Sequence, residues 1–493
     1  MPTPRWLLVL HRYLGVAVGL LMLVWCLSGA VMMFVRYPEL TETQRVAGLP
    51  PIRWEHCCRF ADRSPLAEGQ PVSAAVVEDL AGSPVVRVQT PDGADQVLDL
   101  STGAAMGRSD AGQALRVAEA FRQRTTSSIL GKSPTLQVVD RDQWTVSGDF
   151  KPERPLYKVS LGDPADSELY VSSRTGQAVQ LTTRSGRFWN WLGAVPHWLY
   201  PTILRSNGAL WAQVVIWTSL VGCFLTLTGL YVGLAMLKRA PDRWSPYRKV
   251  WLWHHFAGLG FGVLTLAWVA SGLVSVNPWG FLDSGPDPAR TRVEGASPTW
   301  AAVRTALVRL AAHPPADLVS VSAQPFDGRL YLLGRTSEGG LLRLGPDAGP
   351  APLTASDLAA AAARLASGRA MASAAPLAGE DAYYFRHHGP ALAPAYRVIL
   401  RDGGRYYLDL RTGALLRAVD ANARGYRWLH QGLHRWDFVP GLHDGPVWAV
   451  LTLILLGGVT FGVGTGVYLG VGAVARDGRR LSRKVSGPPG HGG

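Results

Sequence analysis

Four long apolar runs alternate with two long polar segments along this chain of 493 residues. Each run exceeds the roughly 20 apolar residues that a membrane-spanning helix needs. The runs lie at residues 13–35, 209–237, 256–276 and 447–474. The first run has some features of a signal peptide, but it is too long and no small-residue cleavage site follows it, so we interpret it as an uncleaved anchor.

The two polar segments carry the signals of small α+β domains. Paired β-rich runs that flank turn residues predict hairpins at 85–88 with 97–100, 156–161 with 169–172, and 396–400 with 406–410. Apolar residues at helical spacing predict helices at 112–124, 301–312 and 355–365. Thr-Gly turns recur at strand ends, where Gly accepts a positive φ: 101–103, 174–176 and 411–413. The Pro- and Gly-rich stretches 284–298 and 345–352 are predicted loops.

The two halves of the chain repeat each other. One alignment, at an offset of 243, pairs His11/His254, Gly15/Gly258, Gly19/Gly262, Leu21/Leu264, Leu23/Leu266, Trp25/Trp268, Ser28/Ser271 and Gly29/Gly272. A second alignment, at an offset of 237, pairs Trp191/Trp428, His197/His434, Trp211/Trp448, Phe224/Phe461, Thr228/Thr465, Gly229/Gly466, Tyr231/Tyr468 and Gly233/Gly470. We therefore expect two copies of helix, external domain and helix, inserted in the same sense around a pseudo-twofold axis.

The repeat pairs His11 with His254 and His197 with His434. A lone histidine at the edge of hydrocarbon is commonly a capping or snorkelling residue, but a twofold axis brings equivalent side chains face to face. Two imidazoles on opposite faces of a porphyrin hold b-type haem in helical bundles. The sequence predicts two b haems, one near the cytoplasmic end and one near the external end; a structural role for the histidines is the alternative.

Three glycines, a methionine or threonine, and a tryptophan follow the first histidine of each copy on one side of its helix, a glycine-rich side that we call the small-residue face. They are Gly15, Gly19, Met22, Trp25 and Gly29 in one copy, and Gly258, Gly262, Thr265, Trp268 and Gly272 in the other. Such a face leaves room for a flat macrocycle, although glycines four residues apart also let helices approach closely. Trp25 and Trp268 are expected near mid-membrane, where they either fill space between helices or assist electron transfer.

Other candidates rank below these four histidines. His255 aligns with Arg12 and is an alternative ligand to His254, and His430 lies four residues before His434 on the same helical face. His430 could replace His434 as ligand or bind a haem propionate, a role also open to Arg12, Arg205 and Arg248. His387 and His388 are expected in a solvated loop, with metal or substrate contact as the alternative, and His443 at the interface. Cys57 and Cys58 form either a vicinal disulfide or two free thiols, and no C-x-x-C-H occurs for covalent haem.

The net charge of +13 reflects topology rather than a nucleic-acid partner. Basic residues concentrate in the short loop 238–249 and in the tail after residue 475, and short basic loops stay in the cytoplasm. Both termini are therefore predicted to be cytoplasmic. No G-x-G-x-x-G follows a strand, so the electron donor is expected to be a quinol or a separate reductase.

Three motifs resemble the PepSY-associated transmembrane family of bacterial iron-regulated inner-membrane proteins, which includes ferric-siderophore reductases. They are His11-Arg12-Tyr13-Leu14-Gly15, Val195-Pro196-His197-Trp198-Leu199-Tyr200-Pro201 and Trp428-Leu429-His430-Gln431-Gly432-Leu433-His434, together with the hairpins ending in Thr-Gly. The resemblance implies four transmembrane helices, periplasmic PepSY-type domains, b haems and electron delivery to ferric siderophores. The third run departs from the first motif, reading His254-His255-Phe256-Ala257-Gly258.

The expected fold is a membrane α+β protein with four transmembrane helices in two parallel repeats, each with a periplasmic PepSY-like domain. The expected boundaries are transmembrane helices at 1–36, 208–237, 253–276 and 447–474, periplasmic domains at 37–207 and 277–446, a cytoplasmic loop at 238–252 and a cytoplasmic tail at 475–493. The expected function is a di-haem b reductase of the bacterial inner membrane that serves iron uptake. The alternatives are a cytochrome b partner of another periplasmic reductase, and a non-redox PepSY protein that binds peptides or regulates a protease.

Overall fold

The computed structural model describes residues 4–58, 64–126, 133–237, 243–386, 392–438 and 445–485. The chain forms two compact units, each assembled from distant parts of the sequence. The helical unit comprises Met1–Arg36, Trp189–Asp283 and Asn422–Gly493, and the sheet unit comprises Tyr37–Phe188 and Ser284–Ala421.

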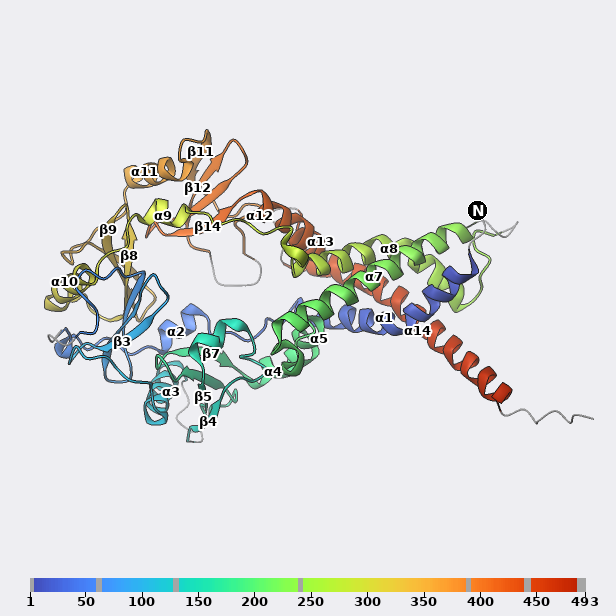
Figure 1. Ribbon diagram of the computed structural model, residues 1–493, viewed down its shortest axis with the longest axis horizontal. Helices are drawn as coiled ribbons and strands as arrows, with labels where there is room; N and C mark the ends of the chain where they lie inside the picture. Colours follow the sequence, from blue (N-terminus) through green and yellow to red (C-terminus); the bar gives the residue numbers. More distant parts are fainter. Residues whose placement is uncertain are drawn as a thin grey trace, which may run out of the picture. The chain divides into compact units, whose positions relative to one another are not determined.

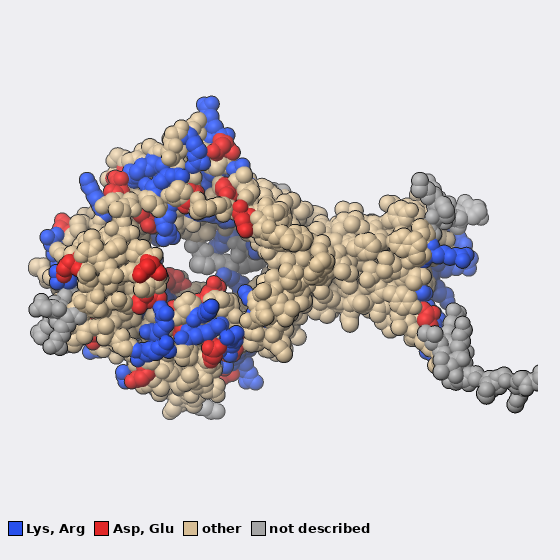
Figure 2. Space-filling view, viewed as in Figure 1, with Lys and Arg blue, Asp and Glu red and all other residues tan. Residues whose placement is uncertain are grey.

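Four long helices build the helical unit (Figure 1). They are α1 (Arg5–Met32), α7 (Gly208–Met236), α8 (Val250–Ser275) and α14 (Pro446–Val485). Each is long and apolar enough to cross a membrane, which confirms the four predicted spans. Helices α1 and α8 each pack against both α7 and α14. The visible middle surface of these helices carries almost no charged residues (Figure 2), as expected of a surface that faces lipid.

Helix α1 begins earlier than the predicted run, because no helix-breaking residue lies between Pro4 and Met32. Proline is well tolerated at a helix N-terminus, where its missing N–H has no intrahelical partner. The early start places His11 in the second turn of α1, and His254 likewise lies in the second turn of α8. Both histidines therefore belong to regular helix and not to its edge.

Short helices connect the strands to α7 and α14. Before α7 they are α4 (Arg184–Leu192), α5 (Ala194–His197) and α6 (Thr202–Arg205). Before α14 they are α12 (Ala421–Tyr426), a π-helix over Arg427–Gly432 and α13 (Leu433–Arg435). Helical turns with π geometry are rare and frequently occur at functional sites. His197 closes α5, and His434 lies in α13.

A six-stranded antiparallel sheet joins the two polar segments within the sheet unit. Its order is β10-β9-β8-β1-β2-β3, with β1 (Ala74–Asp79), β2 (Pro84–Gln89), β3 (Asp95–Asp99), β8 (Leu318–Phe326), β9 (Arg329–Thr336) and β10 (Leu341–Leu344). Val77 of β1 lies opposite Val321 of β8. Helix α10 (Trp300–Ala312) packs its buried Trp300 into the same core. The two segments, predicted as separate α+β domains, thus share one sheet.

Each polar segment also forms a four-stranded antiparallel sheet of its own. One has the order β4-β5-β6-β7 and the other β11-β12-β13-β14. Their strands are β4 (Thr135–Val139), β5 (Leu156–Ser160), β6 (Glu168–Ser172), β7 (Ala178–Thr182), β11 (Met371–Pro376), β12 (Ala395–Leu400), β13 (Arg405–Asp409) and β14 (Leu415–Val419). Helix α3 (Ala111–Thr125) packs against the first sheet and α11 (Ala355–Ala366) against the second. The predicted hairpins and helices are confirmed.

The two four-stranded sheets hold the loop after their first strand in the same way. Tyr170 of β6 donates a hydrogen bond to Asp142, at 2.7 Å. Tyr407 of β13 donates to Asp381, at 2.9 Å. The two tyrosines lie 237 residues apart, the same offset as His197 and His434. The similarity between the halves of the chain therefore extends to residues of the polar segments that local patterns did not single out.

A buried carboxylate lies at the junction of the two segments. Glu78 of β1 is fully buried, pairs with Arg45 and Arg87, and accepts a hydrogen bond from Ser320 of β8. Burial alone would raise the pKa of the Glu78 carboxyl, but Arg87 and Arg45 outweigh burial and hold that pKa below its ordinary value of 4.5. The ionised carboxylate is therefore the form that stabilises this junction.

Three smaller predictions have definite outcomes. Cys57 and Cys58 are joined by a disulfide. Gly103, Gly176 and Gly413 of the Thr-Gly turns all have positive φ, between 69° and 78°. The stretch 284–298, predicted as a loop, contains the short helix α9 (Ala289–Glu294), whose buried Ala289 and Val293 pack into the core beside α11. Two apolar residues four apart are a weak helical signal, and the surrounding Pro and Gly residues favour a loop.

Candidate haem-binding site

His11 of α1 and His254 of α8 face each other in the helical unit, with ring centroids 6.4 Å apart. We call them the first pair. They meet across the bundle, because α1 and α8 both pack between α7 and α14. Two metal–imidazole bonds of about 2 Å each, together with the distance from each bonding nitrogen to its own ring centroid, separate the two centroids by roughly 6 Å. The spacing of the first pair therefore suits one metal ion between the two rings.

Hydroxyl groups of α7 and α14 fix the orientation of the first pair. His11 Nδ1 lies 3.4 Å from Thr228 Oγ1, and His254 Nδ1 lies 3.3 Å from Thr465 Oγ1 and 3.1 Å from the Gly462 carbonyl. Both threonine hydroxyls donate their own proton to a carbonyl of their helix. Each oxygen must therefore accept from the histidine, which assigns the proton to Nδ1 and leaves the Nε2 lone pair for a ligand.

Glycines of the same two helices make room for these rings. A Cβ at Gly229 would lie 2.7 Å from His11 Cε1, and a Cβ at Gly466 would lie 2.8 Å from His254 Cε1. Any larger residue would displace the imidazole. Thr228-Gly229 and Thr465-Gly466 thus play the same role for the two rings of the first pair. The threonine accepts a hydrogen bond from the imidazole, and the glycine leaves space for the ring.

A cavity of about 550 Å³ surrounds the first pair. This is within the range of roughly 300–1,000 Å³ that is typical of ligand sites. The predicted small-residue face lines it, through Gly15, Gly19, Met22, Gly258, Gly262 and Thr265. A Cβ at Gly15 or Gly258 would meet nothing within 4 Å, so open space lies beside both helices. The cavity and the two imidazoles fit a flat macrocycle.

His197 of α5 and His434 of α13 form the second pair, with ring centroids 5.9 Å apart. His197 Nδ1 lies 3.0 Å from the Trp25 carbonyl and 3.2 Å from Ser28 Oγ. His434 Nδ1 lies 3.0 Å from Ser271 Oγ. Both serines donate to carbonyls of their own helices, so each accepts from Nδ1 and again leaves Nε2 for a ligand.

The second pair lies at the ends of α1 and α8 opposite to the first. A Cβ at Gly29 of α1 would come 3.2 Å from His197 Cε1, and one at Gly272 of α8 would come 3.9 Å from His434 Cε1. Helices α1 and α8 therefore carry the histidines of the first pair and the serines that hold the second pair.

The two alternative ligands, His255 and His430, differ in whether a ring nitrogen remains available to bind a metal. His255 uses both ring nitrogens, at 2.8 Å from Ser245 Oγ and at 2.8 Å from the Gly233 carbonyl, so it holds α7 and α8 together and has no nitrogen left for the cavity. His430 donates from Nδ1 to the Ser271 carbonyl at 2.9 Å, and its ring centroid lies 5.5 Å from that of His434. His430 therefore remains a neighbour of the second pair with Nε2 available.

The remaining sequence candidates have varied surroundings. Arg12 lines the cavity of the first pair. Arg205 stacks on Tyr200 and Trp211, and Arg248 is exposed. His387, His388 and His443 lie outside the described residues.

Trp25 and Trp268 are not among the residues that line the cavity of the first pair. Trp25 belongs to the packed core of Met22, Leu225 and Val269. The indole nitrogens of both tryptophans are buried without a hydrogen-bond partner among the described residues. This supports the space-filling interpretation of Trp25.

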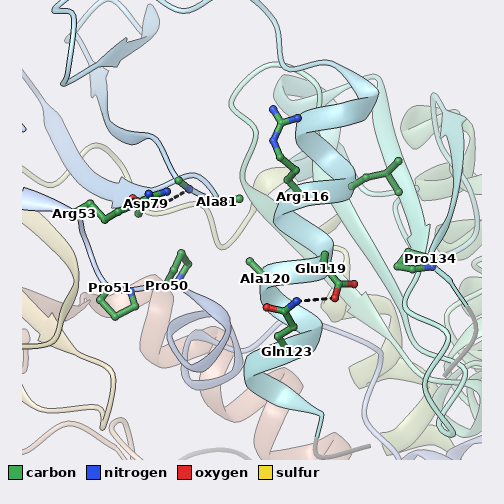
Figure 3. Close-up of a pocket in the computed structure, with 12 residues that line it drawn as sticks. Pro50, Pro51, Arg53, Asp79, Ala81, Arg116, Glu119, Ala120, Gln123 and Pro134 are labelled. Atoms are coloured by element: carbon green, nitrogen blue, oxygen red, sulfur yellow. Dashed lines mark hydrogen bonds and ion pairs between the residues drawn. The ribbon is translucent and has the colours of Figure 1, made fainter. Parts of the chain in front are cut away.

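A second hollow, of about 850 Å³, lies in the sheet unit (Figure 3). Pro50, Pro51 and the turn at Ala81 and Gly82 face helix α3, which contributes Leu115, Arg116, Glu119, Ala120 and Gln123. Arg53 lies 3.5 Å from the buried Asp79 carboxylate and passes over Gly82, where a Cβ would come 2.2 Å from its Nη2. Glu119 is engaged by Arg122 and Gln123, whereas Arg116 is exposed. The pocket combines apolar walls with two arginines and with two carboxylates, Asp79 and Glu119, each of which has an arginine partner.

Comparison with known proteins identifies the family of the chain. Residues 8–330 match the model of the PepSY-associated TM region. No curated protein matches the chain. The matched range contains α1, α7 and α8 and the first histidine motif, so it covers three of the four apolar helices described above. This chain is a membrane protein that belongs to the PepSY-associated TM family.

Proposed function

We propose that this protein is a di-haem b reductase of the bacterial inner membrane, which passes electrons across the bilayer to a periplasmic ferric siderophore. One observation carries the proposal: two facing histidine pairs lie at opposite ends of one apolar bundle, each with Nδ1 anchored and Nε2 left for iron. Bound haem b supplies one-electron redox chemistry. His11 and His254 would hold one haem, and His197 and His434 the other, with His430 as a neighbour of the second.

The protein residues do the positioning. The hydroxyls of Thr228, Thr465, Ser28 and Ser271 hold the four imidazoles in one tautomer, as the outer partners of metal ligands commonly do. The apolar core formed by Met22, Leu225 and Val269 excludes water from the middle of the bundle. A site without water keeps its electrostatic surroundings fixed while the charge of a bound group changes.

The same proposal includes two parallel repeats, each with a periplasmic PepSY-like domain, and both termini in the cytoplasm. The matched element order of the two halves supports the repeat, and the arginines at the end of the helical unit near the chain termini (Arg5, Arg12 and Arg476) support the topology. The first pair then lies on the cytoplasmic side. No nucleotide-binding motif follows a strand, so a quinol or a separate reductase is the proposed donor.

The proposed substrate follows from ligand preference. The hard oxygen donors of siderophores bind Fe(III) far more tightly than Fe(II), so one electron releases the metal. The pocket that contains Arg53 and Arg116 would accept a chelate that combines apolar surface with negative charge. We offer it as a docking site for the substrate.

Two measurements test the function. A pyridine haemochrome assay on purified protein should give two b haems per chain. Dithionite-reduced protein, freed of excess reductant under anaerobic conditions, should be reoxidised within seconds to minutes by a ferric siderophore, and not by the iron-free siderophore. The absence of a Soret band after expression with ample haem would reject all redox functions. Two haems that a panel of hydroxamate, catecholate and carboxylate chelates leaves reduced would favour a cytochrome b that serves another reductase.

A further inference from the structure

One arginine directly follows one histidine of each pair. Arg12 follows His11 in the first pair, and Arg435 follows His434 in the second. The corresponding positions after His254 and His197 hold His255 and Trp198. Each pair therefore has one guanidinium next to it in the sequence, contributed by opposite halves of the chain, and Arg5 also lines the cavity of the first pair.

Arg12 borders the cavity of the first pair. Its Nη2 lies 3.6 Å from Asp477 Oδ2, a long ion pair whose carboxylate oxygen also accepts the Tyr13 hydroxyl at 3.0 Å. The Nε of Arg12 is buried without a hydrogen-bond acceptor among the described residues. Arg12 thus keeps at least one donor for an acceptor that the protein itself does not supply.

Arg435 is half-buried beside the second pair. Asp437, two residues away, binds Arg427 through Oδ1, with Nη1 at 2.9 Å and both side chains buried, while its Oδ2 has no hydrogen-bond partner among the described residues. No carboxylate among the described residues lies within ion-pair distance of Arg435. Its backbone carbonyl accepts the Trp448 indole N–H at 2.8 Å, which fixes the residue against α14. A half-buried guanidinium without a counter-ion is costly, and an anion beside it would remove that cost.

We propose that Arg12 and Arg435 bind the propionate carboxylates of the two haems, one at each histidine pair. The inference rests on the proposed function. Guanidinium presents paired N–H donors that match a carboxylate. Arg12 has only a long ion pair with Asp477, and Arg435 has no ion pair among the described residues.

The positions of the two arginines also orient the macrocycles. Arg12 lies in the second turn of α1, whereas Arg435 lies in α13, which packs against α8 near Ser271, at the other end of that helix from His254. The carboxylate edges would therefore point away from each other toward the two polar ends.

The test uses the holoprotein and variants that remove one charge at a time, Arg12→Gln and Arg435→Gln. Each should raise the haem dissociation constant at its own site about 10–100-fold and lower the midpoint potential of that haem, because a positive charge beside the oxidised centre is lost. The propionate bending bands in resonance Raman spectra should change for that haem alone. Lys249→Gln and Arg290→Gln, which remove exposed charges, are the matched controls and should change none of these readouts.

The outcomes separate this inference from the proposed function. Protein without haem rejects the function itself. Two haems with wild-type affinities, potentials and propionate bands in both variants overturn the propionate assignment and leave the function standing. If Arg435→Gln does not yield folded protein, the wild-type spectrum decides: bands of hydrogen-bonded propionates are expected for both haems, and free propionate bands would overturn the assignment.

Discussion

The two histidine pairs reach the same ligand arrangement from different supports. The first pair lies on the long helices α1 and α8, and its anchors are threonines of α7 and α14. The second pair lies on the short helices α5 and α13, and its anchors are serines of α1 and α8. Helices α1 and α8 thus hold ligands at one end and anchor ligands at the other.

This difference predicts unequal sensitivity of the two sites. A ligand in the second turn of a long spanning helix moves only if the helix moves. His197 lies on a four-residue helix, and His434 lies in the last three residues of a helical run that begins at Ala421 and passes through the π-helix, so each depends on its few hydrogen bonds and on the chain that leads to it. We expect the first site to be sensitive to packing and the second to its anchors and to the strands that precede it.

The largest effect should come from removing the ligands. His197→Ala or His434→Ala should each remove about one haem per chain, and His11→Ala or His254→Ala should remove the other, because one imidazole does not hold a bis-histidine haem. Haemochrome assays and separate redox titrations of the remaining haem would measure this. His255→Ala is the control and should retain two haems. Unchanged haem content in His197→Ala would refute the second pair as ligands, and loss of both haems in any single variant would show that the sites are not independent.

The next effect concerns the sheet unit. Glu78→Gln leaves Arg87 without its carboxylate and Arg45 with only the half-exposed Glu42, which should destabilise this unit by about 3–5 kcal/mol. Because the chain passes from β7 through α4 to His197, and from β14 through α12 and the π-helix to His434, heating should release the haem of the second pair before that of the first. Glu42→Gln is the control, since Glu42 is half-exposed and such surface pairs contribute at most about 1 kcal/mol.

Glu78 also gives this stability a pH dependence. Its pKa is lowered in the folded protein, so its contribution is complete above the ordinary value of 4.5 and is lost as the pH falls through the lowered folded pKa. Wild-type protein should therefore lose sheet-unit stability on acidification below that ordinary value more steeply than Glu78→Gln, as measured by thermal unfolding across pH. Parallel pH profiles in the two proteins would show that Glu78 does not stabilise the junction.

The next largest effect should come from overpacking beside the imidazoles, and it should differ between the two histidine pairs. Gly229→Ala and Gly466→Ala place a Cβ within 2.8 Å of a first-pair imidazole, whereas Gly272→Ala places one 3.9 Å from His434. Overpacking of this kind costs about 1–3 kcal/mol, so the first two variants should weaken haem binding at the first pair roughly 5- to 100-fold. Gly272→Ala should bind both haems as the wild type does, and so should the lipid-facing control Gly457→Ala. Equal losses in all four variants would mean that the distances to the imidazoles do not matter.

The sequence predicted which histidines face each other better than it predicted the residues that hold them. The offset of 243 residues and the helical period together identified His11, His254 and the small-residue face that lines the cavity. Ser28 and Ser271 were singled out only as identical residues in the aligned halves of the chain. No further role was predicted, because a serine in an apolar helix ordinarily bonds a carbonyl of its own helix. Nothing within one helix shows that the same oxygen also accepts a proton from a histidine of another helix.

The β1–β8 pairing was missed for a related reason. Val77 and Val321 are 244 residues apart, and alternation of residues predicts a strand without naming its neighbour. The hairpins were predicted because their turns lie in the local sequence. Local sequence patterns do not contain the long-range contacts, either in the sheet or in the candidate haem-binding site.

The smallest effects should come from the anchors, and they complete the comparison. Thr228→Val keeps the shape of a buried side chain but removes the acceptor for His11 Nδ1, and Ser271→Ala does the same for His434. A lost hydrogen bond of this kind costs about 0.5–1.5 kcal/mol, so haem affinity at the affected site should fall roughly 2- to 10-fold.

An imidazole without its Nδ1 acceptor is a less basic ligand that stabilises Fe(III) less, so the midpoint potential of that haem should rise. The contact is 3.4 Å at Thr228 and 3.0 Å at Ser271, so Ser271→Ala should give the larger shift. Thr218→Val, which removes a hydroxyl bonded only within α7, is the control; a comparable shift in that variant would assign the effect to the helix and not to the histidine.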